Sequence, residues 1–181
     1  MKCRNWWLVA ALLACAPVFA VEKGPAKGTL PPALLGKDRD GQVIDLASMH
    51  GKVVIVTFWA SWCGYCLKEL PVLNALQEKA GDDWLRVVAV NVRDETADYR
   101  VMTRQMRDYK LTLTRDRNGQ IAKGYGVDSY PNLWLIDRQG HVWGQHVGYG
   151  EDSLKTIVAE IQALPQAEAE AGTPQAAAAQ G

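Results

Sequence analysis

The chain has 181 residues, of which 48% are hydrophobic and 22% charged, and its 20 lysines and arginines balance its 20 aspartates and glutamates. This length suits one domain with tails, and the apolar fraction can fill a core, which excludes a wholly disordered protein. The balanced charge argues against a nucleic-acid partner, because neutralising phosphates requires a basic excess. The long apolar stretch lies at the N-terminus, so a protein with several membrane spans is also excluded.

The N-terminus has the layout of a secretory signal peptide, predicted to span residues 1–20. Lys2 and Arg4 precede an apolar run over residues 6–16, and small or apolar residues lead to Ala20, the predicted cleavage point. This indicates an exported, periplasmic protein. Residues 12–15, Leu-Leu-Ala-Cys, also resemble a lipobox, which would leave the protein lipid-anchored through Cys15. An uncleaved N-terminal anchor is the third alternative.

The folded part is predicted to span residues 30–164. Residues 21–29 are small, polar and interrupted by glycine and proline, which predicts a flexible lead-in. Residues 165–181 contain almost nothing that a core can bury, which predicts a disordered tail.

Within the folded part, the elements follow from hydrophobic periodicity and turn residues. In chain order, we expect a β-hairpin over residues 33–46, a strand buried on both faces over 53–59, a helix over 63–80, a second buried strand over 85–92, a helical stripe formed by Tyr99, Met102, Met106 and Tyr109, a second hairpin from 133–137 and 141–147, and a closing amphipathic helix over 154–164. This order predicts an α/β layer fold, with a central sheet, helices on both faces and a parallel first crossover.

Two of the four cysteines, Cys63 and Cys66, would remain after removal of the leader. One close pair cannot form a disulfide framework for an exported protein, so the pair is expected to have a chemical role. It follows a buried strand and opens a helix, where unpaired backbone N–H groups and the helix dipole stabilise a thiolate. Cys63 is therefore predicted to be the exposed nucleophile and Cys66 its more buried partner, with Gly64 as the flexible residue between them.

Two other uses of this spacing are less favoured. A zinc half-site would need further ligands, but the mature chain offers only the scattered His50, His141 and His146, so no metal is expected. An inert structural disulfide closing so small a loop would add little stability. A redox-active dithiol is therefore the favoured interpretation, and no cofactor is expected.

Residues 58–66, Phe-Trp-Ala-Ser-Trp-Cys-Gly-Tyr-Cys, followed by Glu69-Leu70-Pro71, closely resemble the thioredoxin superfamily, and most nearly its exported disulfide reductases of the TlpA/ResA type. The resemblance extends through the hairpin 33–46, residues 89–92, Gly126-Val127, Tyr130-Pro131 and residues 135–137. It implies a thioredoxin-like fold: a central mixed sheet flanked by helices, with an N-terminal β-hairpin extension.

The resemblance also assigns roles to site residues. Cys63 matches the attacking cysteine and Cys66 the resolving one, while Pro131 matches a cis-proline that presents the backbone of Tyr130 to an extended peptide. The residues expected to contact the substrate are Trp62, Gly64, Tyr65, Tyr130 and Pro131.

Three acids are candidates for tuning the thiols. Glu69 matches an acid of this branch, with a plain solvated helix carboxylate as the alternative, and Asp94 and Glu95 fall near the place where related reductases carry a tuning acid. Thr57 stands where thioredoxin has a buried aspartate, so the proton of the second cysteine is expected to leave through water or a nearby acid.

The resulting expectation is a monomeric thiol–disulfide oxidoreductase that reduces disulfide-bearing exported proteins and draws electrons from a membrane thiol donor. Apocytochrome c maturation, rescue of over-oxidised cysteines and copper-site maturation are equally compatible tasks. The alternatives are a disulfide oxidase or isomerase, although no residues are left for a dimerisation domain, and a non-catalytic thioredoxin-like binding module.

Overall fold

The computed structural model describes residues 24–164, and the predicted signal peptide, Cys15 and the predicted tail lie outside the described residues. Within this range the chain forms a seven-stranded mixed sheet in the order β2-β1-β5-β4-β3-β6-β7. The strands are β1 (Leu34–Lys37), β2 (Val43–Asp45), β3 (Val53–Trp59), β4 (Leu85–Val92), β5 (Thr112–Asp116), β6 (Asn132–Ile136) and β7 (Val142–Val147). The helices are η1 (Leu46–Met49), α1 (Gly64–Ala80), α2 (Thr96–Gln105), α3 (Gln120–Gly124) and α4 (Glu151–Ala163).

The centre of the sheet is formed by β3 and β4, which run parallel in a register from Val53 opposite Leu85 to Trp59 opposite Asn91. Every residue of β3 is buried, because its unbroken apolar and β-branched run packs against layers on both faces. On its other edge β3 pairs antiparallel with β6, which makes the sheet mixed. The predicted fold class and parallel crossover are confirmed.

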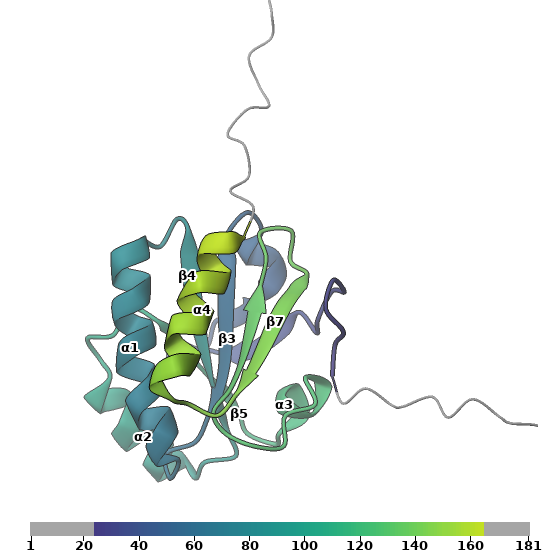
Figure 1. Ribbon diagram of the computed structural model, residues 1–181. Helices are drawn as coiled ribbons and strands as arrows, with labels where there is room; N and C mark the ends of the chain where they lie inside the picture. The colour runs from purple at the N-terminus through teal and green to yellow at the C-terminus, as the bar shows by residue number, and fades with distance from the viewer. Residues whose placement is uncertain (1–23, 165–181) are drawn as a thin grey trace, which may run out of the picture.

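Helices cover both faces of the sheet (Figure 1). On one face, Leu70 and Leu73 of α1 and Ile157 and Ile161 of α4 share a buried cluster that also contains both active-site cysteines. On the opposite face, η1 and the end of α3 pack against the other side of β3 and β4. None of the helices between residues 24 and 164 is long and apolar enough to cross a membrane.

Three elements were not predicted: η1, β5 and α3. The sequence of β5, Thr-Leu-Thr-Arg-Asp, has one apolar residue, so no strand pattern is visible. Two of its polar side chains, Thr114 and Asp116, are nevertheless buried with partners. The Thr114 hydroxyl donates to the carbonyl of Leu35 at 2.6 Å. The Asp116 carboxylate accepts the backbone N–H groups of Gln120 and Ala122 at 3.0 and 2.9 Å and so starts α3.

Residues 24–29, which were expected to belong to a flexible lead-in, contact the sheet and α3. The Gly28 N–H donates to the Val142 carbonyl at 2.7 Å, and the Val142 N–H donates to the Thr29 carbonyl at 2.9 Å. A β-carbon on Gly24 would lie 2.6 Å from the Tyr125 carbonyl oxygen, so only glycine allows the chain to approach this closely. The folded unit therefore begins before residue 30.

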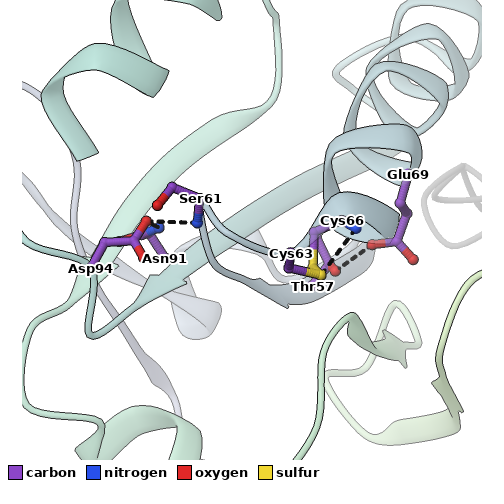
Figure 2. Close-up of a disulfide and its surroundings, with 7 residues drawn as sticks. All are labelled: Thr57, Ser61, Cys63, Cys66, Glu69, Asn91 and Asp94. Carbon is purple, nitrogen blue, oxygen red and sulfur yellow. Dashed lines mark hydrogen bonds between the residues drawn. A yellow bond between two sulfur atoms is a disulfide. The ribbon is translucent and has the colours of Figure 1, made fainter. Parts of the chain in front are cut away.

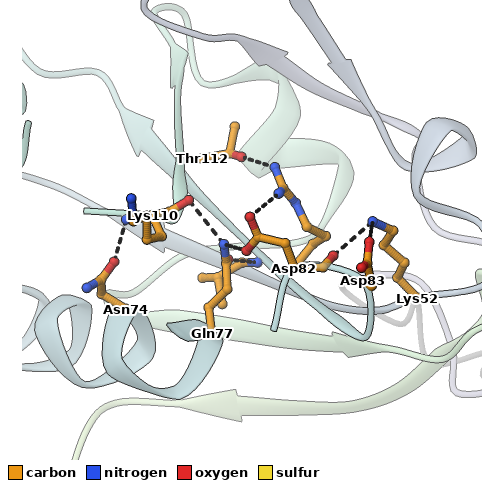
Figure 3. Close-up of polar contacts among 9 residues, drawn as sticks. Lys52, Asn74, Gln77, Asp82, Asp83, Lys110 and Thr112 are labelled. Atoms are coloured by element: carbon orange, nitrogen blue, oxygen red, sulfur yellow. Dashed lines mark hydrogen bonds and ion pairs between the residues drawn. The ribbon is translucent and has the colours of Figure 1, made fainter. Parts of the chain in front are cut away.

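A buried polar cluster joins the C-terminal half of α1 to the sheet (Figure 3). The Gln77 side chain is 0% exposed, and its Oε1 accepts the Val87 N–H at 2.6 Å. Its Nε2 donates to Asp82 Oδ1 at 2.8 Å and to the Lys110 carbonyl at 3.0 Å. One amide therefore connects α1, β4 and the segment before β5, and so holds in place the helix that carries the cysteines.

Replacing Gln77 by leucine is expected to destabilise the protein by about 2 kcal/mol, because the Val87 N–H and the Lys110 carbonyl lose their hydrogen-bond partner. Urea unfolding would measure the change, with Lys79→Gln on the exposed side of α1 as the control that should stay within about 0.5 kcal/mol of wild type. A Gln77→Leu protein as stable as that control would contradict the role given to this amide.

Candidate active site

Cys63 and Cys66 form a disulfide at the start of α1, with their Cα atoms 5.2 Å apart (Figure 2). Cys63 is the N-cap residue of the helix, and its Sγ accepts the Cys66 N–H at 3.1 Å. Cys63 is 7% exposed and Cys66 0% exposed, so Cys63 is the more accessible of the two, although less open than expected. β3 thus delivers Cys63 to a helix N-terminus, where backbone N–H groups stabilise negative charge on sulfur.

Aromatic side chains from two distant segments form a rim beside the disulfide. Trp62 is 73% exposed and Tyr65 is 61% exposed, both next to a cysteine in sequence. The Trp62 ring meets the Tyr130 ring edge to face, with centroids 5.7 Å apart. The Tyr130–Pro131 peptide bond is cis, as the resemblance implied. Exposed aromatic surface at a reactive centre is available for contact with another polypeptide.

Glu69 is buried beside the dithiol, and its interpretation as a solvated carboxylate is wrong. It is 1% exposed, lies three residues after Cys66 on the same helix face, and accepts a hydrogen bond from the Thr57 hydroxyl at 2.7 Å (Figure 2). Burial raises the pKa of Glu69 from 4.5 to about 7, and the hydrogen bond from Thr57 acts in the opposite direction. A carboxyl group that titrates near neutral pH is therefore available at the buried end of the site.

Asp94 is buried just after the end of β4 and holds the loop that precedes Cys63. Its Oδ2 accepts the Ser61 N–H at 2.8 Å and the Asn91 side-chain amide at 2.7 Å (Figure 2). The neighbouring Glu95 is exposed and is the N-cap of α2, which its side chain does not cap. Of these two candidates, the structure brings Asp94 into contact with the active-site loop.

A groove of about 730 Å³ opens beside Tyr130. Its lining includes Val92, Arg93, Gly119, Lys123 and Val127. The groove could not be found from the sequence, because it is formed where the end of β4, the short helix α3, loop residues and the N-terminal segment meet, and these segments share no pattern. The pKa of Tyr130 is raised above its usual value, mainly by burial, while the positive charge of Arg93 opposes the shift.

Arg93 has a left-handed backbone conformation, with φ of 59°, which costs a non-glycine residue about 1–2 kcal/mol. A glycine there would adopt this conformation without strain, so an arginine at this position is unusual, which can be seen only from the backbone.

No group of three or more His, Cys, Asp and Glu side chains in residues 24–164 is arranged to hold a metal ion.

Comparison with known proteins gives consistent matches. Residues 22–161 match the protein family described as Redoxin. The thiol-disulfide oxidoreductase ResA of Bacillus cereus (strain ATCC 10987 / NRS 248) is 32% identical over 124 residues, which cover 68% of this chain and 71% of that protein. The thioredoxin-like protein YneN of Bacillus subtilis (strain 168) is 33% identical over 129 residues, 70% of this chain and 75% of that protein.

Among solved structures, the crystal structure of a DsbE-type thiol:disulfide interchange protein from Chlorobium tepidum superposes with a TM-score of 0.71 at 35% identity. The superposition covers 77% of this chain and 97% of that one. The match therefore spans nearly all of that protein's fold.

Proposed function

This chain is a thiol-disulfide oxidoreductase of the Redoxin family, and from that premise we propose that it reduces the disulfides of other exported proteins. The observation that carries the proposal is the Cys63–Cys66 disulfide at the N-terminus of α1, with a nearly buried Cys63 beside an exposed aromatic rim and an acid of raised pKa near Cys66. Export rests on the sequence of the leader.

In the first step, the Cys63 thiolate of the reduced protein attacks one sulfur of the partner's disulfide. The partner's S–S bond breaks, a bond forms between Cys63 Sγ and the attacked sulfur, and the released thiolate takes up a proton. The helix N-terminus and the Cys66 N–H stabilise the attacking thiolate. The exposed rings of Trp62 and Tyr65, together with Gly64 and the backbone of Tyr130 and Pro131, are the proposed contacts with the partner's chain.

In the second step, Cys66 loses its proton and attacks Cys63 Sγ. The bond between Cys63 and the partner breaks, and the partner's sulfur that was held in it leaves as a thiol. The partner gains two electrons and two protons, and this protein is left with the Cys63–Cys66 disulfide. Glu69 is the proposed acceptor of the Cys66 proton, because a carboxyl with a pKa of about 7 can both take and return a proton at neutral pH. A membrane thiol donor would restore the dithiol by the reverse exchange, and the protein would act as a monomer.

The direction of exchange can be tested through the reduction potential. We expect the Cys63–Cys66 pair to equilibrate with thiol buffers near the value of thioredoxin, about −270 mV, as a reductant requires. A variant that lacks both cysteines should show no redox transition in the same titration. A value near about −120 mV would instead identify an oxidant and would overturn the proposed direction.

A further inference from the structure

The groove beside Tyr130 is lined by two cations, Arg93 and Lys123, and by one acid, Asp128. Arg93 and Lys123 line it and are exposed, and within residues 24–164 neither side chain forms an ion pair or a hydrogen bond. Nearby acids are engaged: both oxygens of the buried Asp116 accept N–H groups of α3, and Asp128 accepts a hydrogen bond from Ser129 at 3.2 Å. The two cations outnumber the one acid of the lining, and their exposed side chains can meet a ligand.

The position of Arg93 is built into the backbone. The residue adopts φ of 59°, and its N–H donates to the Asp116 carbonyl at 3.1 Å, which joins the loop after β4 to the end of β5. A β-carbon on Gly119 would lie 2.9 Å from Cζ of Arg93, so the absence of a side chain at Gly119 makes room for the guanidinium. Backbone strain of this kind concentrates at functional positions, and here it fixes a cation in the wall of a groove.

Tyr130 links the groove to the reactive centre. Tyr130 lines the groove, and its ring also contacts Trp62, the residue before Cys63. A polypeptide bound over Cys63 and the Tyr130 ring would therefore have its flanking residues near this groove. A volume of about 730 Å³ is of the size that binds a small ligand or a few side chains.

We propose that Arg93 and Lys123 select substrates that carry carboxylate side chains next to the reactive disulfide. The inference rests on the proposed function and names the substrate class: polypeptides with Asp or Glu flanking the cysteine. Charges at the rim of a binding site act mainly on the association rate, and salt screens them. The preference should therefore be visible in the rate of the first exchange step.

The test compares two cyclic peptide disulfides that differ only in an Asp-Glu or an Asn-Gln pair beside one cysteine. The reduced full-length protein should react roughly tenfold faster with the acidic peptide at low ionic strength. This ratio should approach one as salt rises from about 0.01 M to about 1 M, because the Debye length falls from about 30 to 3 Å. Arg93→Gln and Lys123→Gln should each lower the ratio, and Arg93→Glu should reverse it.

Two further variants separate charge from structure. Arg93→Gly relieves the backbone strain yet removes the cation, so it should unfold at higher urea concentration and still lose the acidic preference. Arg107→Gln removes an exposed arginine whose side chain is 77% accessible and does not line the groove, and it should keep the wild-type ratio. Equal rates for the two peptides with the wild-type protein would overturn this inference. Failure to reduce either peptide would overturn the proposed function instead.

Discussion

Cys63→Ser is expected to lower insulin-type disulfide reduction to the uncatalysed rate, whereas Cys66→Ser is expected to accumulate covalent complexes with partner proteins. The reason is geometric: Cys63 is the more accessible sulfur and caps α1, whereas Cys66 is fully buried behind it. Without Cys63 no thiolate can begin the exchange, and without Cys66 the mixed disulfide has no internal thiol to break it. Precipitation of reduced insulin and non-reducing electrophoresis measure the two effects.

Thermal unfolding of both variants controls for loss of the fold. Turnover by Cys63→Ser at the wild-type rate would contradict the assignment of the nucleophile. A wild-type protein that binds polypeptides but fails to reduce insulin would favour the binding-module alternative.

Glu69→Gln is expected to remove about 3 kcal/mol of pH dependence from the stability of the disulfide form, at 1.36 kcal/mol for each unit between a pKa of 4.5 unfolded and about 7 folded. Below pH 4.5 the carboxyl is protonated in both states, so its stabilising contribution is fully present. Between pH 4.5 and about pH 7, Glu69 ionises in the unfolded chain but keeps its proton in the folded protein, so the free energy of unfolding falls. Above about 7 the contribution is lost.

Urea unfolding of the oxidised protein across this range measures the effect. Glu78→Gln, which changes an exposed carboxylate on the same helix, is the matched control and should keep the wild-type profile. Thr57→Val should shift the pH at which stability is lost to a higher value, because the hydrogen bond that lowers the pKa of Glu69 is removed. Parallel profiles for wild type and Glu69→Gln would contradict the neutral-range titration of this group.

The elements that could be predicted from the sequence are those that bury apolar side chains. The strands over 53–59 and 85–92 have the predicted bounds, because their unbroken apolar runs leave one arrangement that hides both faces. β5 could not be found in this way, since Thr114 and Asp116 are buried through hydrogen bonds to Leu35 and α3. Those partners are far away in sequence or have no pattern of their own.

The cysteine pair and the burial of Glu69 could be predicted from the sequence, but the groove could not. The dithiol follows from spacing and from its position between a strand and a helix, and the burial of Glu69 was accessible from spacing too, since it shares a helix face with Cys66 and Leu73. The groove was not, because it depends on loops brought together by the sheet and on the backbone conformation of Arg93.

The contact between residues 28–29 and β7 has a consequence for solubility. β7 is the last strand of the sheet, and an open edge invites strand addition by a neighbouring molecule. By pairing with both backbone groups of Val142, Gly28 and Thr29 block the start of this edge without adding a strand. A shortened protein that begins at Leu30 would keep the helices, the sheet and the dithiol but would uncover these groups, and with them a route to aggregation.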